Sequence, residues 1–130
     1  MSQENVEIVR RSMDAYRSRD YEGALAAYHP EVVCDAMVVQ GRVYRGHEGV
    51  AEQARDWVGT WDDWEWEIEE LIDCGDRVLM VVRESGRGKG SGVHVVSKTF
   101  FVYTLRDGQI VRVTILVDRA QALEAAGLRE

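Results

Sequence analysis

The sequence has few of the residues on which several functional classes depend. Its 130 residues include three histidines, two cysteines and one proline, and 16 basic residues stand against 23 acidic ones. Two cysteines without a short Cys or His pairing make neither a disulfide framework nor a zinc site. The net charge of −7 repels phosphate backbones and argues against a nucleic-acid-binding protein.

Long apolar runs are also missing. None approaches the roughly 20 residues that a helix needs to cross a bilayer, and the first 14 residues carry charges from Glu4 onward, unlike a signal peptide. We therefore expect a cytoplasmic protein with no membrane partner. The apolar content of 45% suffices for a core, and the length suits one domain over residues 1–130.

The histidines and glycines form no recognisable cofactor motif. His29, His47 and His94 show none of the short spacings that hold metals, so no metal site is predicted. The glycine-rich segment Gly86–Gly92 is not a phosphate-binding loop, because Lys89 is followed by glycine and not by serine or threonine. We expect a flexible connection between two strands there, and no cofactor.

Apolar spacing predicts three helices in the first half of the chain. Residues three or four apart form one face of the first helix: Val6, Val9, Met13 and Tyr16. A second, short helix is predicted between a cap at Asp20 and a stop at Pro30. The apolar stripe of a third helix follows "RGHEG" and comprises Val50, Ala54, Trp57, Val58 and Trp61.

The remaining segments are typical of β-strands. "VVCDAMVV" (residues 32–39) reads as a buried strand, and "WEWEIEE" alternates apolar and acidic residues. The acidic residues between 62 and 76 are interpreted as a solvated strand face, with a surface for a basic partner as the alternative. Asp107-Gly108 predicts a hairpin, and a last helix is expected between Asp118 and Gly127. The order α-α-β-α-β-β-β-β-α predicts an α+β domain with helices on one face of a curved sheet.

Asp35 is the leading catalytic candidate because it interrupts the apolar run of residues 32–39. An ionised carboxylate in such surroundings is costly unless it is paired, hydrogen-bonded or protonated. If its face is the face of a pocket, Asp35 is a plausible general base for a carbon acid. The alternative is a structural role, paired with a basic residue or with backbone donors at a strand end. We expect Arg83 to pair with Asp35 or Glu70, because buried charges are usually matched, and the alternative is that it anchors an anionic ligand.

Other side chains are weaker candidates. Tyr16, Thr99 and Tyr103 offer hydroxyl groups on faces that can reach a pocket. Trp57 and Trp61 lie one helical turn apart and either roof a cavity or belong to the core. The histidines show no nucleophile–base spacing, so we expect His47 and His94 at the surface and His29 at the end of a helix.

Three motifs carry a resemblance to a known family: "YRGHEGV" (residues 44–50), "GRGKGSGV" (residues 86–93) and "DRAQALEAAGL" (residues 118–128). With the order of elements, they resemble the SnoaL-like branch of the nuclear-transport-factor-2-like superfamily over nearly the whole chain. The resemblance implies a cone-shaped α+β barrel, with a strongly bent, mostly antiparallel sheet around three helices and a short C-terminal helix. It also implies an apolar pocket at the open end of the cone and a homodimer formed by the outer sheet face.

These implications define the expected site. The residues that we expect to line the pocket are Tyr16, Met37, Trp57, Trp61, Arg83, Thr99, Phe101, Tyr103, Ile115 and Val117. The expected dimer surface uses the outer faces of residues 98–105 and 111–117 and includes Phe100.

The resemblance extends to two enzymes of similar architecture, whose catalytic residues can be compared with positions in this sequence. The general-base aspartate of ketosteroid isomerase matches Asp35, but its oxyanion-hole tyrosine falls at Ser12 and its second donor near Phe101. The water-activating aspartate of limonene-epoxide hydrolase falls at Ile115. Both activities are therefore disfavoured.

Two functions are compatible with these observations, and a third is a weaker alternative. The first is a cofactor-free isomerase, cyclase or lyase in which Asp35 moves a proton on a carbonyl-bearing substrate, as in the aldol cyclisation of SnoaL-like cyclases. The second is a non-catalytic dimer that binds or carries a small hydrophobic molecule. The third is a purely structural dimerisation domain whose pocket is filled by side chains.

Overall fold

A single bent sheet organises the protein. The computed structural model describes residues 3–128, and its six strands follow the order β2-β1-β6-β5-β4-β3. The strands are β1 (Tyr28–Ala36), β2 (Arg42–Arg45), β3 (Trp61–Cys74), β4 (Arg77–Gly88), β5 (His94–Arg106) and β6 (Gln109–Leu116). The helices are α1 (Gln3–Arg17), α2 (Tyr21–Leu25), α3 (Met37–Gln40), α4 (Gly46–Val58) and α5 (Arg119–Ala125). All neighbouring strands are antiparallel except β1 and β6, which are parallel.

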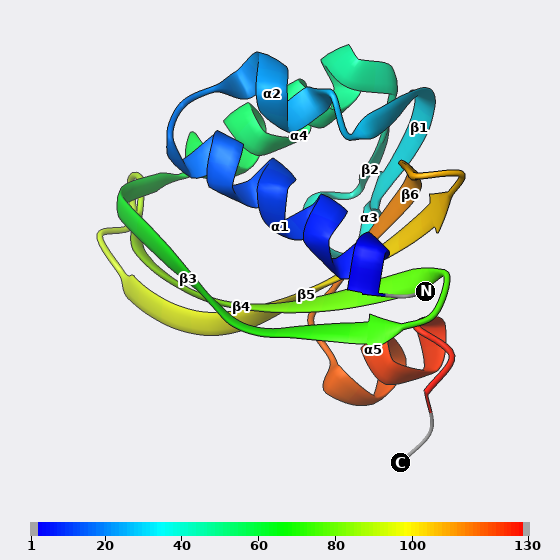
Figure 1. Cartoon of the computed structure of the whole chain (residues 1–130). Helices are drawn as coiled ribbons and strands as arrows, with labels where there is room; N and C mark the ends of the chain where they lie inside the picture. Colours follow the sequence, from blue (N-terminus) through cyan, green and yellow to red (C-terminus); the bar gives the residue numbers. More distant parts are fainter. Residues whose placement is uncertain (1–2, 129–130) are drawn as a thin grey trace.

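The sheet curves around the N-terminal helices. Figure 1 shows α1, α2 and α4 on the concave side of β3, β4 and β5, and α5 on the opposite side of these strands. The predicted α+β architecture with a strongly bent, mostly antiparallel sheet is confirmed.

Two apolar clusters hold these layers together. The cluster on the concave side includes Val9, Val32 and Ile110, each with 0% of its surface exposed. The cluster on the outer side lies under α5, where Ala122 and Leu123 pack with residues of β4 and β5. Removal of this much apolar surface from water is the main source of stability for such a layered fold.

Local signals placed several boundaries correctly. Asp20 caps α2 by accepting the Gly23 N–H at 2.9 Å, and Asp118 caps α5 by accepting the Gln121 N–H at 3.0 Å. Gly127 has φ +84°, and the Leu128 N–H donates to the Leu123 carbonyl at 2.8 Å, which is the closing bond of a glycine-terminated helix.

The strand predicted over residues 32–39 is wrong for its last three residues. β1 ends at Ala36, and residues 37–40 form the short helix α3. The Asp35 carboxylate accepts the Met37 N–H at 3.1 Å, and this local bond turns the chain where a strand would continue. Gly41, with φ +69°, ends α3 before the unpredicted strand β2.

Two further boundaries differ from the prediction. Pro30 lies inside β1, where the β1–β6 register shifts between Tyr28 and Val33, so it does not end a helix. A register shift tolerates a residue that has no N–H to donate. His29 is likewise in β1 and not at a helix end, and Trp61 begins β3 and does not continue α4.

Candidate functional site

A cavity of about 580 Å³ lies between the helices and the concave face of the sheet. Side chains from α1, α2 and α4 line one side, and side chains from β1, β3, β4, β5 and β6 line the other. Its volume falls in the range of roughly 300–1,000 Å³ that is usual for small-molecule sites. Its lining is mainly apolar and aromatic.

Tryptophans dominate one end of this cavity. Trp57 comes from the last turn of α4, and Trp64 and Trp66 come from alternate positions of β3. The rings of Trp64 and Trp66 stack with centroids 6.1 Å apart, and the Arg17 guanidinium lies 4.0 Å from the centre of the Trp66 ring. Arg55, which is exposed, is the one basic side chain among the described residues that line the cavity.

Glu84 is the one carboxylate among these lining residues. Only 5% of its surface is exposed. The indole N–H of Trp57 donates to Oε1 at 2.8 Å, and the Thr99 hydroxyl donates to Oε2. Within residues 3–128 no basic side chain forms an ion pair with Glu84. The cavity therefore holds a buried acid whose two protein donors are both neutral.

Sequence reasoning missed Glu84, although a signal for it exists. Alternate residues of β4 face the cavity, and Met80 and Val82 precede Glu84 on that face. Period-two alternation along "VLMVVRES" thus places the glutamate inside and its neighbour Arg83 outside. Arg83 was selected from the sequence because it interrupts the apolar run, and its neighbour Glu84 was not.

A second polar group lies deeper in the cavity. Tyr28, Tyr103 and Cys34 line it together with Ser12, whose hydroxyl donates to the Ala24 carbonyl at 2.9 Å. Burial raises the pKa of Tyr28 and Tyr103 well above their ordinary values. Burial, followed by the charge of Asp35, raises the pKa of the Cys34 thiol to about 12. These groups are neutral at physiological pH and act as hydrogen-bonding groups, not as nucleophiles.

Asp35, the catalytic candidate from the sequence, does not line the cavity. Its Oδ2 lies 2.8 Å from Nη2 of Arg112 on β6, and its side chain is 25% exposed. Cys34, the preceding residue, lines the cavity, so strand alternation directs Asp35 to the outer face. The structural alternative is observed, with Arg112 and not Arg83 as the partner.

The other expected lining residues divide into two groups. Tyr16, Trp57, Phe101 and Tyr103 line the cavity. The rest of the predicted set does not: Met37, Trp61, Arg83, Thr99, Ile115 and Val117.

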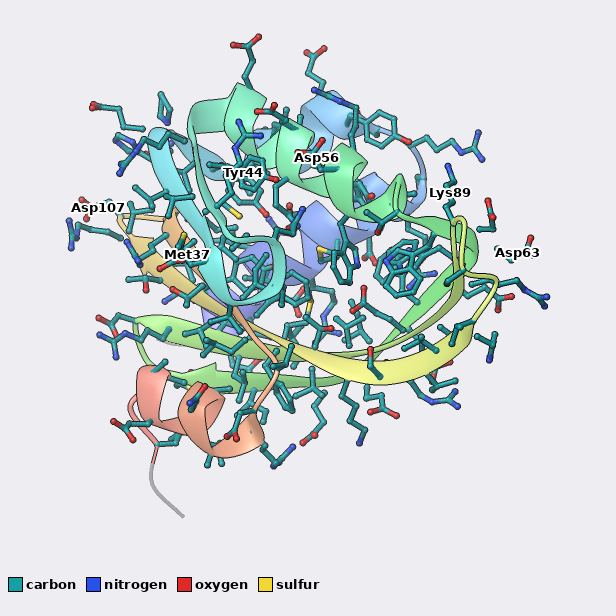
Figure 2. All side chains as sticks on the ribbon, turned by 180° about the vertical axis from the view of Figure 1, so that it is seen from behind. Met37, Tyr44, Asp56, Asp63, Lys89 and Asp107 are labelled. Carbon is teal, nitrogen blue, oxygen red and sulfur yellow. The ribbon has the colours of Figure 1, made fainter. Side chains whose placement is uncertain are left out.

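The reasons for these corrections differ. Met37 is 54% exposed because the chain has turned into α3, and Figure 2 shows it at the opposite end of the molecule from Asp63 and Lys89. Val117 follows the end of β6 and is 55% exposed, and Arg83 is on the outer sheet face. Ile115 is buried in the core, and Thr99 is buried on the concave sheet face, where its hydroxyl donates to Glu84.

Trp61 borders a separate space of about 10 Å³, which it shares with Trp57, Trp64 and Glu84. The histidines lie outside the cavity. The Nε2 atom of His47 is 2.7 Å from the Tyr28 carbonyl, in place of the expected solvent-facing position, whereas His94 is exposed as expected.

Removing the charge of Asp35 should have a small effect. We expect Asp35→Asn to lower the free energy of unfolding by about 0.5–1 kcal/mol, because the pair with Arg112 is partly solvated. Ligand binding should not change. Urea unfolding measures the stability, and a probe titration measures the affinity. A loss of affinity above tenfold would show that Asp35 contributes to the binding site.

Metal and membrane signatures are absent from the described part of the chain. No cluster of three or more metal-ligating side chains occurs within residues 3–128. Over the same residues, no helix has both the length and the apolar character needed to span a membrane.

Comparison with known proteins identifies the family. Residues 9–113 match the SnoaL-like domain. The chain belongs to this family. No protein among the curated sequences matches the SnoaL-like chain described here.

Solved structures agree with this assignment. TerC, co-crystallised with polyporic acid, is 25% identical and superposes with a TM-score of 0.73 over 95% of this SnoaL-like chain and 98% of TerC. An NTF2-like protein from Burkholderia pseudomallei gives 25% identity and a TM-score of 0.74 over 95% and 97% of the two chains. A SnoaL-like polyketide cyclase from Jannaschia, at 20% identity, gives a TM-score of 0.76 over 100% and 96% and supports the fold alone.

Proposed function

We propose that this SnoaL-like protein binds one small, largely apolar molecule in its cavity. The observation that carries the proposal is the 580 Å³ cavity lined mainly by apolar and aromatic side chains, with a single buried carboxylate among them. Core packing normally leaves few voids larger than a water molecule, so a space of this size is typical of a binding site. TerC, a protein of similar fold, was crystallised with a small molecule, which supports the proposal.

Filling the cavity tests this proposal. N-phenyl-1-naphthylamine, a neutral probe that fluoresces in apolar surroundings, should bind the wild-type protein and quench its tryptophans. Ala54→Trp, which places a large ring on the α4 wall, should weaken binding at least tenfold. Glu48→Ala, at an exposed position of the same helix, is the matched control and should bind normally. Absence of probe binding to the wild-type protein would refute the proposal.

Proton transfer by Glu84 is a second candidate function. The supporting observation is that Glu84 borders the cavity and is held by Trp57 and Thr99 in a fixed position, as a general base must be. Trp64 lines the same cavity, and its indole N–H has no partner among the described residues, so it offers a donor for a developing oxyanion. Glu84 thereby replaces Asp35 as the proposed base for a carbonyl-bearing substrate.

The deep hydroxyl groups do not suit the same reaction. Glu84 pairs with Ser97 across the sheet, and Tyr103 is six residues farther along β5, a path of about 20 Å along the bent strand at 3.3 Å per residue. A base and an oxyanion donor that act on one enolisable unit must lie much closer together. The two polar ends are better suited to the two ends of an elongated ligand.

Isotope exchange tests the catalytic candidate. In D₂O, the wild-type protein should accelerate α-proton exchange of a cyclic aromatic ketone such as 2-tetralone, measured by NMR. Glu84→Gln should reduce the protein-dependent rate at least 100-fold while Asp35→Asn leaves it unchanged. Equal rates with and without protein, together with tight probe binding, favour the non-catalytic function.

A homodimer through the outer sheet face is also part of the proposal. Because α5 covers Phe100, the surface available for such a contact comprises the charged outer positions of β4 and β5, including Arg83 and Lys98. Light scattering with size-exclusion chromatography should report twice the chain mass, and a mass of one chain would exclude the dimer.

A further inference from the structure

The charge on Glu84 has no counterpart in the described protein. Its carboxylate is 5% exposed and accepts hydrogen bonds from an indole and a hydroxyl group, both neutral. No ion pair reaches it within residues 3–128. A buried anion of this kind is stabilised most directly by a cation in contact with it. Since the carboxylate borders the cavity, a bound molecule has access to it.

The walls beside Glu84 favour a cation as well. Trp57 and Trp64 border both the main cavity and the small space next to Glu84. Indole faces attract cations through the ring quadrupole, and the attraction is stronger where water is excluded. The protein already uses this property at Trp66, whose ring carries the Arg17 guanidinium at 4.0 Å.

We infer that the ligand carries an alkylated ammonium group, which binds at Glu84 beside Trp57 and Trp64. This inference rests on the proposed binding function and specifies its ligand class. An alkylated ammonium suits the place better than a primary amine, because the walls next to Glu84 are mainly aromatic and apolar, with Trp57, Trp64 and Val82 among them, and favour a cation with an apolar surface. The apolar body of the ligand extends from there along β5 toward Tyr103.

The rim of the cavity presents a competing charge. Arg55 lines the cavity and could attract an anionic ligand. Its side chain is exposed, so water and salt screen its charge, whereas the buried charge of Glu84 is screened far less. The ammonium site therefore has the stronger electrostatic basis, and an anionic probe belongs in the test.

Three probes of nearly equal shape separate these possibilities. Phenyltrimethylammonium, its neutral carbon isostere tert-butylbenzene, and the anion 4-tert-butylbenzoate are titrated into the wild-type protein by calorimetry and tryptophan fluorescence. We expect the cation to bind at least tenfold more tightly than the neutral isostere. Glu84→Gln keeps an acceptor for the Trp57 N–H, and should abolish this preference while leaving the affinity for tert-butylbenzene unchanged.

Matched variants keep the result interpretable. Glu67→Gln removes the same charge at an exposed position of β3 and should retain the preference. Trp64→Leu, with Glu84 intact, should reduce it. Equal wild-type affinities for cation and neutral isostere would overturn the ammonium inference and leave the binding function standing, as would a preference for the anion. Failure of all three probes to bind would refute the binding function itself.

Discussion

Phe100→Glu should destabilise the folded chain by about 3–5 kcal/mol, a large fraction of the roughly 5–15 kcal/mol that holds a typical domain together. Phe100 is 4% exposed and packs in the cluster that α5 covers on the outer face of the sheet. The substitution removes a large apolar side chain and buries an unpaired charge. Urea unfolding followed by tryptophan fluorescence measures the loss.

From the sequence, Phe100 was expected to lie in a subunit interface, whereas in the structure it lies under α5. The experiment distinguishes these two locations. Val96→Glu places the same charge on the same face of β5, where the native side chain is 50% exposed. It should change the free energy of unfolding by no more than about 0.5 kcal/mol. If Phe100→Glu instead yields a folded monomer of wild-type stability, α5 does not cover this residue in solution.

Elements with strong local signals could be predicted from the sequence. The capping residues Asp20 and Asp118 and the glycine at 127 act within one helical turn, so their effect is encoded nearby. Asp107 and Gly108 both adopt positive φ, as the predicted hairpin turn requires. Long-range features, such as the parallel pairing of β1 with β6, have no comparable local signature.

The face of a strand that meets the cavity was harder to predict. Val33 and Asp35 alternate with Val32 and Cys34, so both faces of β1 carry apolar residues and alternation alone cannot choose the inner one. The choice is made by contacts with β6, where Arg112 takes the carboxylate on the outer face. In β4 both faces are likewise apolar, with Leu79 and Val81 on one and Met80 and Val82 on the other, so alternation groups Glu84 with Met80 and Val82 but does not say which face meets the cavity.

The site also depends on residues brought together from distant segments. Hydrogen bonds connect Trp57 of α4 and Thr99 of β5 to Glu84 of β4. No spacing pattern in the sequence predicts these contacts. Sequence reasoning found Trp57 and Thr99 separately as site candidates. It lacked the glutamate that joins them, since a charged residue next to Arg83 in a strand is usually solvated.

The neutral group at the deep end of the cavity predicts a marked loss of stability in alkali. Burial raises the pKa of Cys34 from 9.0 to about 12, and burial also raises the pKa of Tyr28 and Tyr103. In the unfolded chain these groups lose their protons at lower pH than in the folded chain. Folding therefore retains protons that the unfolded state releases, and the free energy of unfolding falls as pH rises above the unfolded values.

The expected slope and its dependence on Cys34 can be measured. Each group contributes a decrease of about 1.4 kcal/mol per pH unit between its unfolded and folded pKa values, which for Cys34 means between pH 9 and about 12. Urea unfolding at pH 8, 9, 10 and 11 should show little change below pH 8.5 and a progressive loss above it. Cys34→Ala should be less stable at pH 8, because it leaves a small void. Above pH 9, however, its free energy of unfolding should fall less steeply with pH, by about 1.4 kcal/mol per pH unit, which is the contribution of one proton.

Cys74→Ala, at a partly exposed thiol, is the control and should alter this slope less. An unchanged slope in Cys34→Ala would mean that this thiol is accessible to water, and the deep end of the cavity would then be open to solvent.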